Sequence, residues 1–250
     1  MVDRILSVTN HKGGVGKTTT AVNIAYGFSE IGKEVLIVDL DPQGSATLHL
    51  GIEDDGSGLL YAMQNALALP VVATGAKGLA LVPSGPVFAE ARQRFSGVLG
   101  TELLSRCFSR TEGPWDIVVI DCPPSLDMLT WNALRVTRHV VIPVEANRLA
   151  LRSVRQTMET MALARKENRV LELAAVIVCR AHPRRRIHRE VVSELEKSLP
   201  HKVAPVVREK VAVAEAPGFG LPVAMYAPDS SGAADYREVS RWLSTGLFRS

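Results

Sequence analysis

The stretch Asn10-His11-Lys12-Gly13-Gly14-Val15-Gly16-Lys17-Thr18-Thr19 decides the fold, because it joins an apolar run at 5–10 to an amphipathic segment at 18–32. Its glycines allow backbone N–H groups to turn inward toward an anion. The positive end of the helix that follows points to the same place. This order of strand, glycine loop and helix predicts a nucleotide phosphate site formed by residues 12–19.

Two lysines lie within this loop. Lys17 is expected to reach the β- and γ-phosphates, and Thr18 supplies the hydroxyl that binds Mg²⁺. The usual pattern G-x-x-x-x-G-K-[ST] has glycine at position 11, whereas this chain has His11 followed by Lys12. The alternative is a glycine-rich turn with two solvated lysines, and the strand and helix on the correct sides argue against it.

Short apolar runs rich in β-branched residues alternate with segments of helical periodicity. The runs are 5–10, 34–41, 79–84, 115–122, 139–146, 171–179 and 202–207, and the helical segments are 18–32, 148–167, 188–199 and, more weakly, 59–69. Strands that are apolar throughout are typical of parallel sheets covered on both faces. The pattern predicts an α/β fold, with a doubly wound, mostly parallel sheet of the P-loop NTPase type and helices on both faces. We expect one domain over residues 1–250.

The composition is that of a soluble globular protein, with 46% hydrophobic and 22% charged residues in a chain of 250. No apolar run approaches the roughly 20 residues of a membrane-spanning helix, and the first residues do not form a signal peptide. We therefore expect a cytoplasmic protein. Cys107, Cys122 and Cys179 form no C-x-x-C pair, which argues against a zinc or iron-sulfur site.

Aspartates stand at the ends of two predicted strands. Asp39 and Asp41 end the second run, and Asp121 ends the fourth. The carboxyl ends of parallel strands meet at one edge of the sheet, where α/β proteins bind ligands. Asp121 suits Mg²⁺, which keeps most of its waters and needs few carboxylates. We expect Asp41 to orient an attacking water and Asp39 to hold the loop or the metal shell, although an isolated aspartate at a strand end is often only a turn former.

Positive charge is concentrated in one part of the chain. Residues 1–150 contain 12 Lys+Arg and 15 Asp+Glu, whereas residues 151–215 contain 14 and 8. The densest basic stretch, at the start of a predicted helix, comprises Arg180, Arg184, Arg185, Arg186 and Arg189. Arginines there can hold phosphates without reading bases, which predicts sequence-independent, salt-dependent binding to double-stranded DNA. The alternative is a solvated helix face neutralised by nearby glutamates.

Five motifs together resemble one family. KGGVGKTT at 12–19, DLDPQGSAT at 39–47, DCPPSLDMLTWNAL at 121–134, PVEA at 143–146 and AEAPGFGLPV at 214–223 are similar to the ParA/Soj branch of the ParA/MinD ATPases, which carry a deviant Walker A motif. The resemblance runs from about residue 3 to residue 245. It implies ATP and Mg²⁺ as cofactors and a homodimer in which Lys12 reaches the partner's phosphates.

The same resemblance implies a molecular switch with slow ATP hydrolysis, in which Lys12, Lys17 and Asp41 are catalytic. A ParB-like or cargo adaptor protein would stimulate hydrolysis. The closed dimer would bind nucleoid DNA non-specifically and position a plasmid, a chromosome or a protein complex.

Two segments depart from the family pattern. Val207-Arg208-Glu209-Lys210-Val211-Ala212 replaces an Ile-Pro-Arg-Asn-Val-Arg-like segment that helps form the adenine pocket. Arg208 is kept as a nucleotide-binding candidate, and Glu209 stands where a basic residue is expected. Arg180-Ala181-His182 replaces a Met-Tyr-Asp-like run at the end of the sixth predicted strand.

Two alternative functions stay open. A MinD-like or flagellar-regulator-like ATPase would bind membrane through apolar residues of its tail, here Trp242, Leu243, Leu247 and Phe248. We favour packing of the last helix on the sheet, because Tyr236, Val239 and Trp242 recur at helical spacing and Gly246 is expected to interrupt the helix. A ligase of the dethiobiotin-synthetase type shares the fold but lacks the second lysine of KGGVGKTT.

Overall fold

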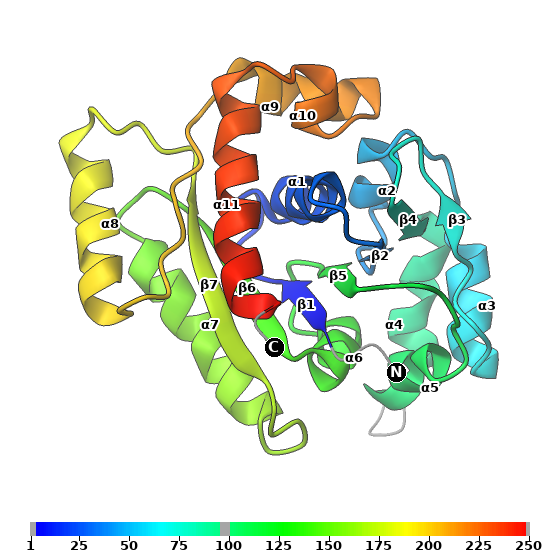
Figure 1. Ribbon diagram of the computed structural model, residues 1–250. Helices are drawn as coiled ribbons and strands as arrows, with labels where there is room; N and C mark the ends of the chain where they lie inside the picture. The colour runs from blue at the N-terminus through cyan, green and yellow to red at the C-terminus, as the bar shows by residue number, and fades with distance from the viewer. Residues whose placement is uncertain (1–3, 96–100, 249–250) are drawn as a thin grey trace.

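The computed structural model describes residues 4–95 and 101–248, and within them the chain forms one seven-stranded sheet (Figure 1). The strand order is β3-β4-β2-β5-β1-β6-β7, with β3 antiparallel to β4 and every other pair parallel. The strands are β1 (Ile5–Val8), β2 (Val35–Asp39), β3 (Val72–Ala73), β4 (Leu79–Val82), β5 (Ile117–Asp121), β6 (His139–Glu145) and β7 (Glu172–Cys179). The predicted mostly parallel sheet is confirmed.

Helices cover both faces of this sheet (Figure 1). On one face lie α1 (Lys17–Glu30), α2 (Ser45–His49), α9 (Val211–Glu215), α10 (Val223–Tyr226) and α11 (Ser231–Leu247), with a 3₁₀ turn, η3, at Ala216–Phe219. On the other lie α3 (Ser57–Asn65), η1 (Pro86–Glu90), α4 (Ala91–Arg94), α5 (Leu103–Phe108), α6 (Met128–Val136), α7 (Ala150–Ala164) and α8 (Arg186–Ser198). The sheet is thus doubly wound.

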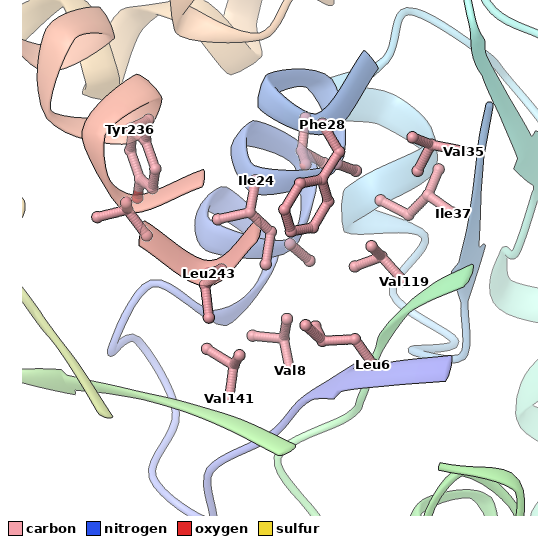
Figure 2. Close-up of a cluster of buried hydrophobic side chains, with 14 of the residues drawn as sticks. Leu6, Val8, Ile24, Phe28, Val35, Ile37, Val119, Val141, Tyr236 and Leu243 are labelled. Atoms are coloured by element: carbon pink, nitrogen blue, oxygen red, sulfur yellow. The ribbon is translucent and has the colours of Figure 1, made fainter. Parts of the chain in front are cut away.

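Burial on both faces explains why the strands are apolar throughout. In β5, Ile117 and Val119 pack toward α1 and α11, whereas Val118 and Ile120 pack toward α5 and α6. Figure 2 shows the first face, where side chains of α1 and α11 meet those of β1, β2, β5 and β6. Since successive side chains of a strand point to opposite faces, both faces need apolar residues, and the fully buried Asp39 and Asp121 stand at the ends of their strands.

The last helix packs on the core, as its spacing predicts. Tyr236, Val239 and Leu243 are buried against α1, and the Phe248 ring stands edge-on to Phe28 with 5.9 Å between centroids. The expected interruption at Gly246 is wrong, because α11 continues to Leu247. A glycine within a helix costs only about 1 kcal/mol, which burial of Leu247 offsets. In the described parts of the chain, no helix has both the length and the apolar character needed to cross a membrane.

One predicted strand is wrong and one strand is not predicted. Residues 202–207 make only isolated β-bridges beside β7, between Val176 and Val203 and between Ala181 and Arg208. The Ala204 N–H donates to the Val176 carbonyl, and the next amide to donate to β7 is that of Val207, to the Val178 carbonyl, where a regular ladder would use Val206. The extra residue interrupts a continuous ladder. The sequence does not predict β3, since two residues are too few to show a period. The weak helix at 59–69 corresponds to α3.

Gly27 lies where α1 crosses α11, and a β-carbon there would lie 2.2 Å from Ser240 Oγ and 2.7 Å from Ser240 Cβ. We expect Gly27→Ala to lower the free energy of unfolding by about 1–3 kcal/mol, through overpacking that exceeds its gain in helix propensity. Urea denaturation measures this change. Gly246→Ala on α11 is the control, because nothing lies within 4 Å of its added β-carbon. Equal denaturation midpoints for the two variants would contradict this packing.

Candidate active site

The glycine loop lies between β1 and α1, at the edge where the parallel strands end. Gly14 and Gly16 have φ of 72° and 91°, in the left-handed region that favours glycine. Gly16 precedes the first residue of α1, Lys17. The backbone therefore turns at two glycines directly before a helix N-terminus, which is the arrangement that binds phosphate.

Side-chain hydrogen bonds connect the first part of the loop to α7. Asn10 Oδ1 accepts hydrogen bonds from the Lys12 backbone N–H at 3.0 Å and from Ser153 Oγ at 2.6 Å. The His11 ring also contacts α7, because its Nε2 lies 3.0 Å from Thr160 Oγ1. His11 is thus held by α7, which explains how a side chain is accommodated where the usual pattern has glycine.

The two lysines are placed differently. Lys17 is only 8% exposed, and its Nζ donates to the Lys12 carbonyl at 3.1 Å. Burial lowers the pKa of Lys17, and the charge of Asp121 opposes that shift. The Lys12 side chain is 41% exposed, and its Nζ lies 3.4 Å from Glu145 Oε2 at the end of β6. An exposed pair of this kind is weak, so Lys12 is free to exchange Glu145 for a stronger anion.

The carboxylates of Asp39 and Asp41 have distinct surroundings. Asp39 is fully buried, and its Oδ2 accepts from the Thr47 backbone N–H at 2.9 Å and from Thr47 Oγ1 at 2.8 Å. Its Oδ1 accepts from the Asp41 N–H at 3.1 Å. Both oxygens are therefore occupied, which supports the loop-holding role, and the role of Asp39 in the metal shell stays a prediction. Asp41 is half-buried, and its charge raises the pKa of Lys17 against the effect of burial.

Asp121 ends β5 in register with Val8 of β1 and Asp39 of β2. Its carboxylate is fully buried, and neither oxygen has a hydrogen-bond partner among the described residues. Burial and then the charge of Asp39 raise the pKa of Asp121 well above its usual value, while the Thr18 hydroxyl and Lys17 oppose that shift.

A buried carboxylate without a partner is costly. A divalent cation with its waters would satisfy the oxygens of Asp121, and the nearby Thr18 hydroxyl is a suitable second group. The residues present therefore fit an Mg²⁺ site formed by Thr18 and Asp121.

A cavity of about 180 Å³ opens beside the glycine loop. Gly16 and Thr19 line one side, residues 179–180 and 207–210 line the other, and Tyr236 of α11 also contributes. A nucleotide whose phosphates lie on the loop would extend its base into such a neighbouring space. Arg180 belongs to this wall, whereas the other four predicted DNA-binding arginines lie ahead of α8 and in its first turn.

Arg208 is held in the cavity wall by Asp235. Its Nη2 donates to Asp235 Oδ1 at 2.6 Å, and its Nε lies 3.1 and 3.0 Å from the two carboxylate oxygens. Asp235 neutralises the guanidinium and raises the pKa of Arg208. The predicted contact of Arg208 with nucleotide stays a prediction. The next residue, Glu209, pairs with His182 Nε2, so the two segments that depart from the family pattern touch each other.

The remaining four predicted DNA-binding arginines lie ahead of α8 and in its first turn. Arg189 Nη1 donates to two carbonyls of the preceding loop, at 3.1 and 3.0 Å. Arg186 forms an ion pair with Glu190 at 2.6 Å. Arg184 and Arg185 are exposed, and their side chains have no ion-pair partner in the part of the chain that the structure describes. The structure thus leaves two of the four side chains free for an external anion.

Sequence reasoning misses three residues of the site. Glu145 ends β6 as Asp121 ends β5, so the same strand-end rule, applied to the PVEA motif, identifies it. Thr47 and Asp235 contribute by hydrogen bonds to Asp39 and Arg208. No periodicity or spacing in the sequence marks such pairs.

We expect Asp121→Asn to abolish the dependence of ADP affinity on Mg²⁺. The wild-type protein should bind ADP at least about tenfold more tightly with Mg²⁺ than with EDTA, a difference of about 1.4 kcal/mol. The variant should bind ADP equally in both, as titration calorimetry would measure. Asp116→Asn is the control, because Asp116 precedes β5 and accepts from the Glu34 N–H at the opposite end of the strand. A normal Mg²⁺ effect in Asp121→Asn would exclude the assigned role.

Comparisons with known proteins agree with this geometry. A family model described as an AAA domain matches residues 3–173. The sporulation initiation inhibitor protein Soj of Bacillus subtilis is 36% identical over 245 residues, which cover 95% of this chain and 97% of that protein. The chromosome-partitioning ATPase Soj of Thermus thermophilus is 38% identical over 239 residues, covering 95% of this chain and 94% of that protein.

A solved structure shares the whole fold. Cobyrinic acid a,c-diamide synthase from Mycobacterium smegmatis, with bound ADP and magnesium, has a TM-score of 0.81 and 29% sequence identity, and the match covers 95% of this chain and 92% of that one. The fold, the glycine loop with its second lysine and the full-length likeness to both Soj proteins lead to one conclusion. The chain belongs to the ParA/Soj family of P-loop ATPases.

Proposed function

We propose that this chain is an ATP-dependent dimerising switch that binds DNA non-specifically and positions a cargo through partner-stimulated ATP hydrolysis. Lys12 is the observation that carries the proposal. It stands beside a complete phosphate loop, yet its ammonium group is exposed and holds only a 3.4 Å contact with Glu145. A lysine placed in this way is suited to the phosphates of a second subunit.

ATP with Mg²⁺ is the nucleotide of this site. Residues 13–19 surround the phosphates, and Lys17 exchanges the Lys12 carbonyl for a phosphate oxygen. Thr18 and Asp121 would hold Mg²⁺, which neutralises charge on the phosphates when it is bound. Asp41, half-buried at the same sheet edge, orients the attacking water.

Dimerisation and hydrolysis are coupled through Lys12. In a closed dimer each Lys12 leaves Glu145 and stabilises charge on the partner's transferring phosphoryl group, as an arginine finger does. Two exposed apolar side chains support a docking surface for the second copy. Leu126 follows β5 and Leu149 precedes α7, 47% and 53% exposed at the same edge of the sheet.

We expect Asp41→Ala to dimerise with ATP but to lose hydrolysis by about 100-fold, since it removes the group that orients water. Lys12→Gln should lose hydrolysis with nearly unchanged nucleotide binding by the monomer, whereas Lys17→Ala should lose nucleotide binding. Phosphate release and light scattering after gel filtration measure the two properties. Normal turnover by Asp41→Ala would show that its assigned role is wrong.

The free arginines ahead of α8 support the DNA-binding part of the proposal. Arg184 and Arg185 are exposed just ahead of α8. The Arg189 side chain donates hydrogen bonds to two carbonyls of this loop, which restrains the backbone that carries their charges. Contacts to phosphate carry no base information, so this binding is independent of sequence. This function places the protein on nucleoid DNA in the cytoplasm. It also requires a ParB-like or cargo adaptor protein that stimulates ATP hydrolysis.

Binding to random-sequence duplex DNA, measured with ATP and with ADP over a salt series, tests the proposal. We expect tight binding only with ATP and Mg²⁺. Arg184→Ala/Arg185→Ala should lower the slope of log affinity against log salt by about 2, because each phosphate contact contributes about 0.9. Lys166→Ala/Arg169→Ala removes the same charge from exposed positions before β7 and should keep the slope. Absence of DNA binding in both nucleotide states would exclude this function.

The two alternatives predict other results. A membrane-binding ATPase would sediment with anionic liposomes in ATP and lose this on deletion of residues 242–250, but Leu243 and Leu247 are buried in the core. An ATP-dependent ligase would hydrolyse ATP quickly only with a small-molecule substrate. The exposed Lys12 at the phosphate loop argues against the ligase, and the burial of Leu243 and Leu247 argues against the membrane-binding ATPase.

A further inference from the structure

The outer side of α7 carries a row of arginines that belong neither to the nucleotide site nor to the loop ahead of α8. Arg148 lies just before the helix, and Arg152 and Arg155 follow at intervals of four and three residues, which places all three on one side. All three residues are exposed. None of them forms an ion pair or a side-chain hydrogen bond with a residue that the structure describes. Three positive charges therefore face solvent without a counter-charge.

This arrangement is unfavourable for the helix itself. Like charges three and four residues apart on a helix repel each other. Positive charge near a helix N-terminus is also unfavourable, and the first turn of α7 contains no acidic residue. Glu159 is the one acidic residue of α7 and stands four residues after Arg155, yet the two side chains do not pair. Departures from local helix preference of this kind are expected mainly at functional surfaces.

The side chains beside these arginines indicate the kind of partner. Met158 and Leu163 are 37% and 53% exposed on the same helix. Arginine and methionine are enriched in the contact surfaces between proteins. Surfaces that bind DNA are more polar, and most of their hydrogen bonds go to phosphate and sugar. A row of arginines bordered by apolar side chains therefore fits an acidic segment of a protein better than a DNA duplex.

The opposite side of α7 contacts the phosphate loop. Ser153, next to Arg152 in the chain, is buried, and its Oγ donates to Asn10 Oδ1 at 2.6 Å. The same Asn10 oxygen accepts the Lys12 backbone N–H at 3.0 Å. A displacement of α7 by a partner on its outer side would therefore reach Lys12 through one side chain and two hydrogen bonds.

We propose that Arg148, Arg152 and Arg155 form the docking surface for an acidic segment of a partner protein, and that a partner bound there acts on Lys12 through α7. The inference rests on the proposed function, since it assigns a surface and a charge to the protein that stimulates hydrolysis. Arg148 also lines a groove between α7 and α8 together with Glu190 and Glu194. Arg152 and Arg155 are therefore the better positions for a test.

A charge-swap experiment on the full chain tests the docking surface. The probe is a synthetic helical peptide whose glutamates have the spacing of the three arginines, with leucines beside them, and fluorescence anisotropy measures its binding. Arg152→Glu/Arg155→Glu should weaken binding more than about tenfold, because attraction becomes repulsion. This variant should instead bind the same peptide with lysines in place of the glutamates, which also shows that it is folded. Failure of the wild-type protein to bind the acidic peptide would overturn the proposal.

Other occupants of this surface predict different results. Arg184→Ala/Arg185→Ala is the matched control, because it removes two charges from the loop ahead of α8 and should keep peptide binding. Arg152→Ala/Arg155→Ala should lose peptide binding and keep the salt dependence of DNA binding. A lower salt slope in that variant would assign the surface to DNA, and loss of its ATP-dependent dimer would assign it to a second copy. Either result would overturn the proposal.

Phosphate release tests the link to Lys12. The acidic peptide should raise hydrolysis by the wild-type protein at least about fivefold, the lower end of usual coupling between two sites. Ser153→Ala should keep the peptide affinity and lose this rise. Peptide binding without a rise in the wild-type protein, or an equal rise in the variant, would overturn the transmission through α7. A wild-type protein that bound the peptide but neither dimerised nor hydrolysed ATP would overturn the proposed switch and keep the docking surface.

Discussion

A carboxylate buried without a hydrogen-bond partner at the end of β5 is the constraint on which the site depends. Asp121 lies in register with Asp39 in the middle of the sheet, and burial raises the pKa of both. Two adjacent buried acids are costly when both are charged. Lys17 offsets part of this charge from the first turn of α1, but its Nζ donates to the Lys12 carbonyl. The remaining negative charge is what a cation bound with the phosphates would balance.

At this edge of the sheet, residues of the same type have different roles because their surroundings differ. Asp39 has both oxygens occupied by Thr47 and the following backbone, so it fixes the loop in which Asp41 stands. Asp41 keeps solvent access and can meet a water molecule. The two lysines also differ in their surroundings, because Lys17 is buried within the loop whereas the Lys12 side chain is 41% exposed.

Most of the fold could be predicted because parallel strands covered on both faces must be apolar throughout, and the glycine loop has a fixed spacing. The failures have physical causes. The run at 202–207 has the composition of a strand, but an extra residue before Val207 prevents a continuous ladder. Gly246 is tolerated in α11 because Leu247 beyond it is buried. In the site, Asp121 could be predicted from its place at a strand end, whereas the pairing of Arg208 with Asp235, 27 residues away, could not.

The basic stretch shows why charge density alone does not define a surface. Arg180 and Arg184 are four residues apart and both are exposed, but Arg180 lines the cavity beside the glycine loop, whereas Arg184 lies in the loop ahead of α8. The pair of His182 with Glu209 lies between them and joins this segment to the cavity wall. The loop that carries Arg184 and Arg185 is thus in direct contact with the wall of the cavity beside the glycine loop. A shift of this wall on nucleotide binding would reach the proposed DNA surface through directly contacting residues, which is the physical requirement for coupling two sites.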